Sequence, residues 1–443
     1  MSHETLVVRA VASAMLAEGA WTETDLMARG SSVFDKRPRW MVAAVTAVMA
    51  AHPAREGVTV ADLVALLSSR PGVMRAIRRA HVVVRRWAIP VVTPVPQRWT
   101  VPAFASANAL ASWLELSPVE LAWFADVKGL GRNPELDEPL RHYRAHWVAK
   151  RRGGVRLLEA PKPRLREMQR RMLREILDAI PPHDAAHGFR RGRDARSHAA
   201  LHERQAVVLR LDLEDFFLSV SLTRVVAMFR AAGYADDVAH LLGRLCTHRT
   251  NASCPLPVLG AYPTEADLRA RRNAERLART LHLPQGAPTS PAVANLCAYR
   301  LDVRLGAAAA AVGATYSRYA DDLVFSGGED FAARAHRFAA LVGGVVLEEG
   351  FRVNHRKTSI MGRGARQVVG GLVVNAHAQV PRATFDTVKA IVRNCIEHGP
   401  ASQNRDGHPD FRAHLRGLVG WAGGAADSPR RAKLDALFRQ IVW

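Results

Sequence analysis

The chain has 443 residues, 48% of them hydrophobic and 23% charged, which excludes a largely disordered protein and leaves room for two or three compact units. Its 62 Lys and Arg residues against 41 Asp and Glu residues give a net charge of +21, so nucleic acid is the first partner to expect. The basic excess is concentrated, because residues 141–175 hold twelve basic and only three acidic side chains.

The first hundred residues predict a helical unit. Apolar residues recur at three- and four-residue spacing, as at Val60, Leu63 and Leu67, which is the helical period. The chain does not open with a basic-then-apolar leader, and the apolar run 41–51 is too short to cross a bilayer, so we expect a cytoplasmic protein with no membrane partner. Four prolines within 90–102 predict an extended connector and a domain boundary near residue 100.

The four cysteines show no paired spacing that would suggest a disulfide framework. Cys246, His248 and Cys254 are conceivable zinc ligands, but a fourth ligand at a suitable spacing is missing. Ordinary thiols in a reducing cytoplasm are the simpler interpretation.

Helices and a hairpin are predicted after the connector. Ser117 followed by Pro118 and then Glu120 is typical of a helix start, with an N-cap and a proline in the first turn. Gly153-Gly154 suits a turn between two short strands. A long basic helix is predicted over Pro163–Ile180, where two prolines follow.

Two later segments place aspartates at strand ends. Val207–Phe217 is short and apolar enough for a buried strand, and the residues around Tyr319–Asp322 alternate as two strands with acids at the hairpin tip. If these strands pair, Asp212, Asp321 and Asp322 converge. Two-metal phosphoryl transfer needs such carboxylates around two Mg²⁺ ions about 4 Å apart. A lone Asp-Asp pair is equally consistent with a polar turn.

The rest of the chain is predicted to be mainly helical. The stretches concerned are 264–282, Pro291–Ala311, Phe331–Val342 and 381–443. We therefore expect three units: a helical N-terminal extension over 1–100, a catalytic unit over 101–375, and a helical C-terminal unit over 376–443.

Segments in a fixed order resemble the motifs of reverse transcriptases. Tyr319–Asp322 is similar to the family's Tyr-x-Asp-Asp hairpin, and Gln285–Pro291 to its Gln-Gly-x-x-x-Ser-Pro segment. The resemblance covers about residues 106–443. It implies an α+β right-hand polymerase, with fingers, a palm of antiparallel sheet packed on helices and a helical thumb, to which the N-terminal extension is added. It also implies an RNA-directed DNA polymerase that uses dNTPs, with two Mg²⁺ ions held by Asp212 and the hairpin aspartates.

The resemblance further implies the nucleotide contacts. Phe217 matches the steric gate, a ring that would collide with a ribose 2′-hydroxyl, although a plain core phenylalanine is the alternative. Gln285 and Gly286 would lie beside the incoming nucleotide, where a loop-to-helix junction of purely structural role is the alternative. Lys357 matches a lysine near the triphosphate, or is a surface lysine. The cations similar to the fingers clamp are Arg156, Lys162 and Arg164.

Within the family, the closest likeness is to retron-type bacterial enzymes, carried by 187–193, His202 and 369–372. It implies that a structured noncoding RNA is copied into single-stranded DNA, primed from a 2′-hydroxyl so that the product is branched, and that the system acts in antiphage defence with an effector protein. The implied RNA contacts are His198, His202, Arg412 and Arg416.

Two departures from the retron pattern affect the subtype only. Retron enzymes usually carry Asn-Ala-x-x-His where this chain begins with His198, and Val-Thr-Gly where it has Gly370 in the middle position. The nearest alternative is another bacterial defence reverse transcriptase that makes unbranched or untemplated DNA. An inactive RNA-binding scaffold is disfavoured by the three intact aspartates.

Overall fold

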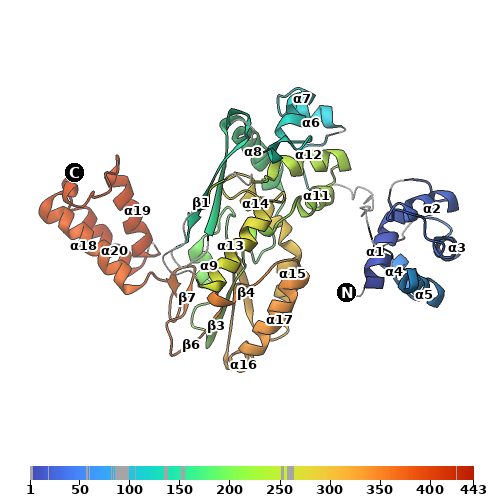
Figure 1. Cartoon of the computed structure of the whole chain (residues 1–443). Helices are drawn as coiled ribbons and strands as arrows, with labels where there is room; N and C mark the ends of the chain where they lie inside the picture. Colours follow the sequence, from blue (N-terminus) through green and yellow to red (C-terminus); the bar gives the residue numbers. More distant parts are fainter. Residues whose placement is uncertain are drawn as a thin grey trace. The chain divides into compact units, whose positions relative to one another are not determined.

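The computed structural model divides into two compact units, Met1–Pro96 and Gln97–Trp443 (Figure 1). It describes residues 3–17, 19–55, 58, 60–80, 82, 84, 99–104, 106–133, 138–150, 155–250, 254–256, 264–425 and 427–443. Within these residues no helix is long and apolar enough to cross a membrane.

The first unit is helical, as predicted. Its helices are α1 (His3–Met15), α2 (Glu23–Ser31), α3 (Met41–Ala51), α4 (Val60–Ser68) and α5 (Pro71–Ala80). They enclose an apolar core of their own, to which α5 contributes Val73 and Ile77. Most of the predicted connector over 90–102 lies outside the described residues.

The second unit begins with two capped helices and a hairpin. These elements are α6 (Ala107–Trp113), α7 (Pro118–Phe124), β1 (Tyr143–Ala149), β2 (Val155–Pro161) and α8 (Pro163–Glu175). The predicted cap at Ser117 is confirmed, because its side chain and that of Glu120 form a capping box. The two strands around Gly153-Gly154 are confirmed, whereas the turn itself lies outside the described residues.

A four-stranded antiparallel sheet forms the centre of this unit, in the order β4-β5-β3-β6. Its strands are β3 (Val207–Asp212), β4 (Thr315–Tyr319), β5 (Asp322–Gly327) and β6 (Ser359–Gly362). The predicted hairpin with the aspartates at its tip is confirmed. Because Asp212 pairs directly with Asp322, both aspartates lie at the same end of the sheet.

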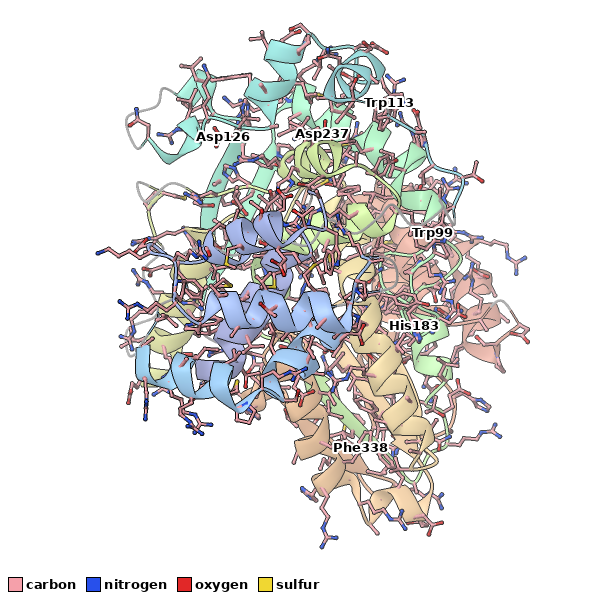
Figure 2. The ribbon with its side chains drawn as sticks, turned by 90° about the vertical axis from the view of Figure 1, so that its right-hand side faces the viewer. Trp99, Trp113, Asp126, His183, Asp237 and Phe338 are labelled. Carbon is pink, nitrogen blue, oxygen red and sulfur yellow. The ribbon has the colours of Figure 1, made fainter. Side chains whose placement is uncertain are left out.

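Helices cover one face of the sheet. They are α15 (Tyr299–Ala310) and α17 (Ala335–Glu348), and their apolar residues share a core with Leu209, Leu211 and Phe325 of the sheet. Phe338 of α17, labelled in Figure 2, packs against Phe325 with ring centroids 5.1 Å apart. This sealed face anchors the strands that carry the aspartates.

Several predicted boundaries are corrected. The strand predicted to reach Phe217 ends at Asp212, and the short helix α10 (Phe216–Ser219) follows. The helix predicted from Pro291 is divided at Ala298 into α14 (Ser290–Cys297) and α15, and α8 ends five residues before Ile180. The helix predicted from Phe331 is divided into α16 (Glu329–Ala332) and α17. The remaining helices are α9 (Ala195–Ala200), α11 (Leu222–Ala231), α12 (Asp236–Cys246) and α13 (Glu265–Ala278).

The chain ends with a small hairpin and three helices. They are β7 (Val368–Val369), β8 (Leu372–Val373), α18 (Arg382–His398), α19 (Phe411–Gly423) and α20 (Pro429–Phe438), and the helices lie together in Figure 1. Their apolar residues share a core with Val208 and Val324 on the second face of the sheet. The mixed helix and antiparallel-sheet class is confirmed, while the division into fingers, palm and thumb stays a prediction.

Candidate active site

Three carboxylates gather at one end of the sheet. Asp212 ends β3, Asp322 begins β5, and Asp321 lies in the turn between β4 and β5. The turn is tight, since Ala320 adopts the left-handed conformation with φ 56°, and the amide of Leu213 donates to the carbonyl of Asp321 at 2.8 Å. The backbone thus brings together the acids that the sequence predicted.

Two cations bind these carboxylates directly. Lys357 Nζ donates to both oxygens of Asp212 at 2.8 and 2.9 Å, and the guanidinium of Arg210 donates to Asp322 at 2.7 to 3.0 Å. Although the three carboxylates lie at one end of the sheet, within the described residues no group of three His, Cys, Asp or Glu side chains is arranged to hold a metal ion as it stands. Lys357 and Arg210 occupy the oxygens that a metal ion would take.

In the part of the chain that the structure describes, no cation forms an ion pair with Asp321, and the pKa of this residue differs accordingly. Burial, reinforced by the charges of Asp212 and Asp322, raises the pKa of Asp321 to about 6. Burial also raises the pKa of Asp322, against the opposing effect of Arg210. Negative charge is therefore concentrated beyond what the protein's own cations neutralise. An oxygen-rich donor set of this kind fits Mg²⁺.

A loop after α17 places the lysine. Leu213 forms a bridge with Val353, and the amide of Asn354 donates to the carbonyl of Asp212 at 2.7 Å. Lys357 therefore follows a segment that is paired with the end of β3. The neighbouring Arg356 turns to Asp267 of α13, at 2.8 Å, so the predicted insertion over 264–282 helps to hold this loop.

A cavity of about 420 Å³ contains the predicted nucleotide-binding residues Phe217, Gln285 and Gly286. Gly286 is required there, because its φ is +138° and a Cβ would lie 2.7 Å from the carbonyl oxygen of Glu159 in β2. The amide of Glu159 donates to the carbonyl of Gln285 at 2.9 Å. The cavity wall is thus fixed to the β1–β2 hairpin.

The cations at this cavity differ from those expected. Its lining includes Arg166 and Arg170 of α8, one helical turn apart. The predicted Lys162 and Arg164 instead contact Glu138 and the carbonyl of Glu115. Arg156 is exposed on β2 and is not part of this lining. Arg170 and Arg174 share the i, i+4 spacing of Arg166 and Arg170, so the sequence held no signal that singles out the pair at the cavity.

His198 and His202 are buried, each 0% exposed, so in this structure they do not offer an RNA contact from solvent. His202 bonds the hydroxyls of Ser317 and Ser326 at 2.6 and 2.7 Å, and His198 bonds Ser317 at 3.0 Å. His198 lies in α9 and His202 lies two residues after its end, so both histidines hold the β4–β5 hairpin from this segment.

The predicted RNA contacts on α19 are differently placed. Arg412 and Arg416 are exposed, and they lie over the rings of Trp443 and Phe438. Cys246 and Cys254 are free thiols. His248, the third residue of the conceivable zinc group, instead faces the buried Glu159 at 3.7 Å.

Comparison with known proteins decides the family. A family model described as "Reverse transcriptase (RNA-dependent DNA polymerase)" matches residues 148–372, which include the sheet, all three aspartates and the cavity. The chain belongs to the reverse transcriptase family. The matched span ends at β8, so α18, α19 and α20 lie outside it.

The curated relatives that this reverse transcriptase matches include retron enzymes. The chain is 40% identical over 291 residues to "Retron Mx65 reverse transcriptase" from Myxococcus xanthus, covering 64% of this chain and 61% of the relative. It is 38% identical over 304 residues to "Retron Mx162 reverse transcriptase" from the same organism, with 65% and 58% covered. It is 28% identical over 255 residues to "Retron Ec86 reverse transcriptase" from Escherichia coli, with 57% and 69% covered. The retron-type likeness is confirmed, and the chain spans about three fifths of the length of the first two relatives.

Proposed function

We propose that this protein is an RNA-directed DNA polymerase of retron type. The observation that carries the proposal is the convergence of Asp212, Asp321 and Asp322 beside a cavity lined by Phe217 and Gln285. In the reaction, a primer hydroxyl would attack the α-phosphorus of a dNTP. A new P–O bond forms, pyrophosphate leaves, and the hydroxyl proton is released.

Two Mg²⁺ ions are the cofactors of the proposal, and Asp212, Asp321 and Asp322 would hold them. When bound, they would activate the attacking hydroxyl and neutralise charge on the leaving pyrophosphate. The electrostatics support this assignment, because burial and the charges of Asp212 and Asp322 raise the pKa of Asp321, and a bound cation would offset that cost of ionisation.

Lys357 and Arg210 would then exchange partners. In the structure each neutralises one aspartate, and Lys357 is 44% exposed on a loop beside the site. Lys357 Nζ, which lies at Asp212, would then be close to a triphosphate bound next to that residue. There it can stabilise charge on the leaving group or donate a proton to it.

The cavity residues would bind and select the nucleotide. Phe217, half-buried on α10, would face the sugar and exclude a 2′-hydroxyl. Arg166 and Arg170 supply two cations at the cavity, suited to the triphosphate. The earlier candidates Arg156, Lys162 and Arg164 stay proposals for template or triphosphate contacts.

The finer retron features belong to the same proposal. The template would be a cognate structured noncoding RNA, the product single-stranded DNA joined through a 2′-linkage, and the setting antiphage defence with an effector protein. The names of the relatives support the retron type. Arg412 and Arg416 on the exposed side of α19 would contact the phosphates of the RNA or of the duplex.

Primer extension tests the polymerase. The full chain, an RNA template with an annealed DNA primer, dNTPs and Mg²⁺ should give extended DNA. Asp321→Asn should give none, while Asp330→Asn, which changes an exposed aspartate of α16, should match the unchanged protein. Extension by Asp321→Asn, or no extension by the unchanged protein on any template including its own upstream RNA, would contradict the proposal.

A second experiment tests the retron type. The chain is expressed with its native upstream DNA, and the recovered nucleic acid is digested with ribonuclease and sequenced. Discrete single-stranded DNA carrying a 2′-linked ribonucleotide is expected. Discrete DNA without that linkage would retain the polymerase and favour the alternative enzyme that makes unbranched or untemplated DNA.

A further inference from the structure

Phe189 has an unusual backbone and an unusual exposure. Its φ is +60°, in the left-handed region that bulky residues rarely adopt, and it is 48% exposed although it is a large apolar residue. Such a conformation persists only where the surroundings enforce it, and it is concentrated at functional sites.

The catalytic hairpin enforces this conformation. A Cβ on Gly188 would lie 2.7 Å from the amide nitrogen of Ala320, so glycine alone allows this close approach. The carbonyl of Gly188 accepts from Asn295 Nδ2 at 2.8 Å, and the amide of His187 donates to the carbonyl of Arg318, also at 2.8 Å. The residues before Phe189 are therefore bound on two sides.

One buried arginine connects these contacts to the aspartate turn. Arg318 is 0% exposed and is paired with Asp302 through two bonds of 2.7 and 2.8 Å. Its other nitrogen donates to Asn295 Oδ1 and to the carbonyl of Ala320, both at 3.0 Å. The same guanidinium thus fixes the turn before Asp321 and, through Asn295, the segment that carries Phe189.

The ring of Phe189 lies at the nucleotide cavity. Phe189 and Phe217 both line it, and their ring centroids are 6.0 Å apart at an interplanar angle of 53°. On its other side Phe189 is 6.5 Å from the ring of Tyr319, the first residue of the Tyr-x-Asp-Asp motif. The ring of Phe189, whose backbone is held rigidly, therefore lies next to the ring of Phe217, which is proposed to select the sugar.

We propose that Phe189 is a specificity-determining positioning residue, which holds the Phe217 ring so that a ribonucleotide is rejected. A gate excludes a 2′-hydroxyl by steric clash, and the clash is lost if the ring can turn aside. Phe189 blocks that movement, because its own position is fixed by Gly188, Asn295 and Arg318. The inference rests on the proposed function and extends it to a residue outside the gate position.

The test measures kcat/KM for a dNTP and for the matching rNTP in the full chain. Phe217→Ala should raise the rNTP to dNTP ratio most. Phe189→Ala should raise it about threefold to tenfold, the factor that corresponds to the usual strength of an aromatic pair. Because Phe189 acts through Phe217, the double variant should show the ratio of Phe217→Ala alone. Additive effects of the two substitutions would overturn the positioning role.

Two further variants separate selection from folding. Phe189→Gly removes the ring and also relieves the left-handed strain, so it should fold and show the same raised ratio as Phe189→Ala. Leu347→Ala, at an apolar side chain of α17 that is 61% exposed, should leave the ratio unchanged. If the unchanged protein incorporates no dNTP, the proposed function fails. If it does, and Phe189→Ala and Phe189→Gly leave the ratio unchanged, this inference alone fails.

Discussion

The two ends of one face of the central sheet have opposite chemistry. At the tip end, Arg210 and Asp322 form an ion pair that is partly open to water, and the buried Asp212 is paired with the half-exposed Lys357. At the base end, four residues or about 13 Å further along β5, Ser326 is fully buried and bonded to His202. The same histidine bonds the buried Ser317 of β4, which lies opposite Val324 in the middle of β5. Both ends belong to the same antiparallel strands and the same side-chain face.

Solvent access accounts for the difference. The base end is covered by α9 and by the apolar cluster that joins Val208 and Val324 to the C-terminal helices, so only neutral hydrogen-bonded groups are tolerated there. At the tip end the two cations Arg210 and Lys357 stay partly hydrated and can exchange partners. One end of this face is therefore proposed to carry the chemistry, and the other supports the hairpin.

Lowering the pH should have the largest effect on stability, and it should act mainly through the buried histidines near the base end. Burial lowers the pKa of His198 to about 2, of His202 to about 3 and of His187 to about 4. Between pH 6.5 and 4 the unfolded chain binds protons that these folded histidines do not, so stability present at neutral pH is lost as the pH falls. Urea unfolding at a series of pH values should show a steady decrease below pH 6.5.

Matched histidine variants sharpen this pH prediction. His198→Asn removes one titrating group and should flatten the decrease, whereas His336→Asn, at an exposed position of α17, should not. A free energy of unfolding that is constant from pH 7 to pH 5 would contradict the assignment of neutral histidines to the base end.

Lys357→Met should affect the tip end by lowering the incorporation rate about a hundredfold, because it removes the cation proposed to stabilise or protonate the leaving group. The melting temperature should change little, since Lys357 is 44% exposed. Arg356→Met is the matched control: this neighbouring cation binds Asp267 rather than an active-site aspartate. Equal loss of rate in both variants would show that the loop, not the Lys357 ammonium group, matters.

His202→Ala should lower the free energy of unfolding by about 2 to 4 kcal/mol, because it removes two buried hydrogen bonds and leaves the Ser326 hydroxyl without its partner, while Ser317 keeps its bond to His198. Chemical denaturation measures the change. Adding Ser326→Ala should recover part of the loss, since the unpaired hydroxyl is then absent. No recovery would mean that packing of the imidazole, rather than its hydrogen bonds, supports the hairpin.

Gly370→Ala should have the smallest effect, a loss of about 1 kcal/mol, because the residue has a φ of +55° and a side chain there is strained. Gly364→Ala is the control, because its φ is not in the left-handed region and a Cβ there meets nothing within 4 Å. Thermal unfolding distinguishes the two, and equal melting temperatures would show that the β7–β8 turn relaxes without cost.

Local patterns predicted much of the fold. The alternation around Tyr319–Asp322 gave the hairpin, and Ser117 with Glu120 gave a helix start, because strand period and capping are short-range properties. Where apolar residues continue past the end of a strand, the predicted end of that strand is wrong. The segment to Phe217 leaves the sheet at Asp212, since Asp215 adopts a φ of 47° and starts α10.

The site was predictable only in part, because side-chain partners are set by tertiary packing. The aspartate positions followed from the motifs. In contrast, five arginines of α8 are equivalent in composition, and only the packed helix selects Arg166 and Arg170 for the cavity. Likewise nothing local to Arg318 indicates its buried partner Asp302, and the burial of His198 and His202 depends on the hairpin that packs over them.

If the two ends of the sheet face have separate roles, substitutions at each end should have different effects. Incorporation rate and melting temperature are measured together for Asp321→Asn and His202→Ala. Asp321→Asn should reduce the rate about a thousandfold or more without lowering the melting temperature, because burial and like charges already disfavour the ionised Asp321. His202→Ala should lower the melting temperature, and the fraction that remains folded should keep its rate. A variant Asp321→Asn that retains activity, or that loses it only by unfolding, would contradict the account.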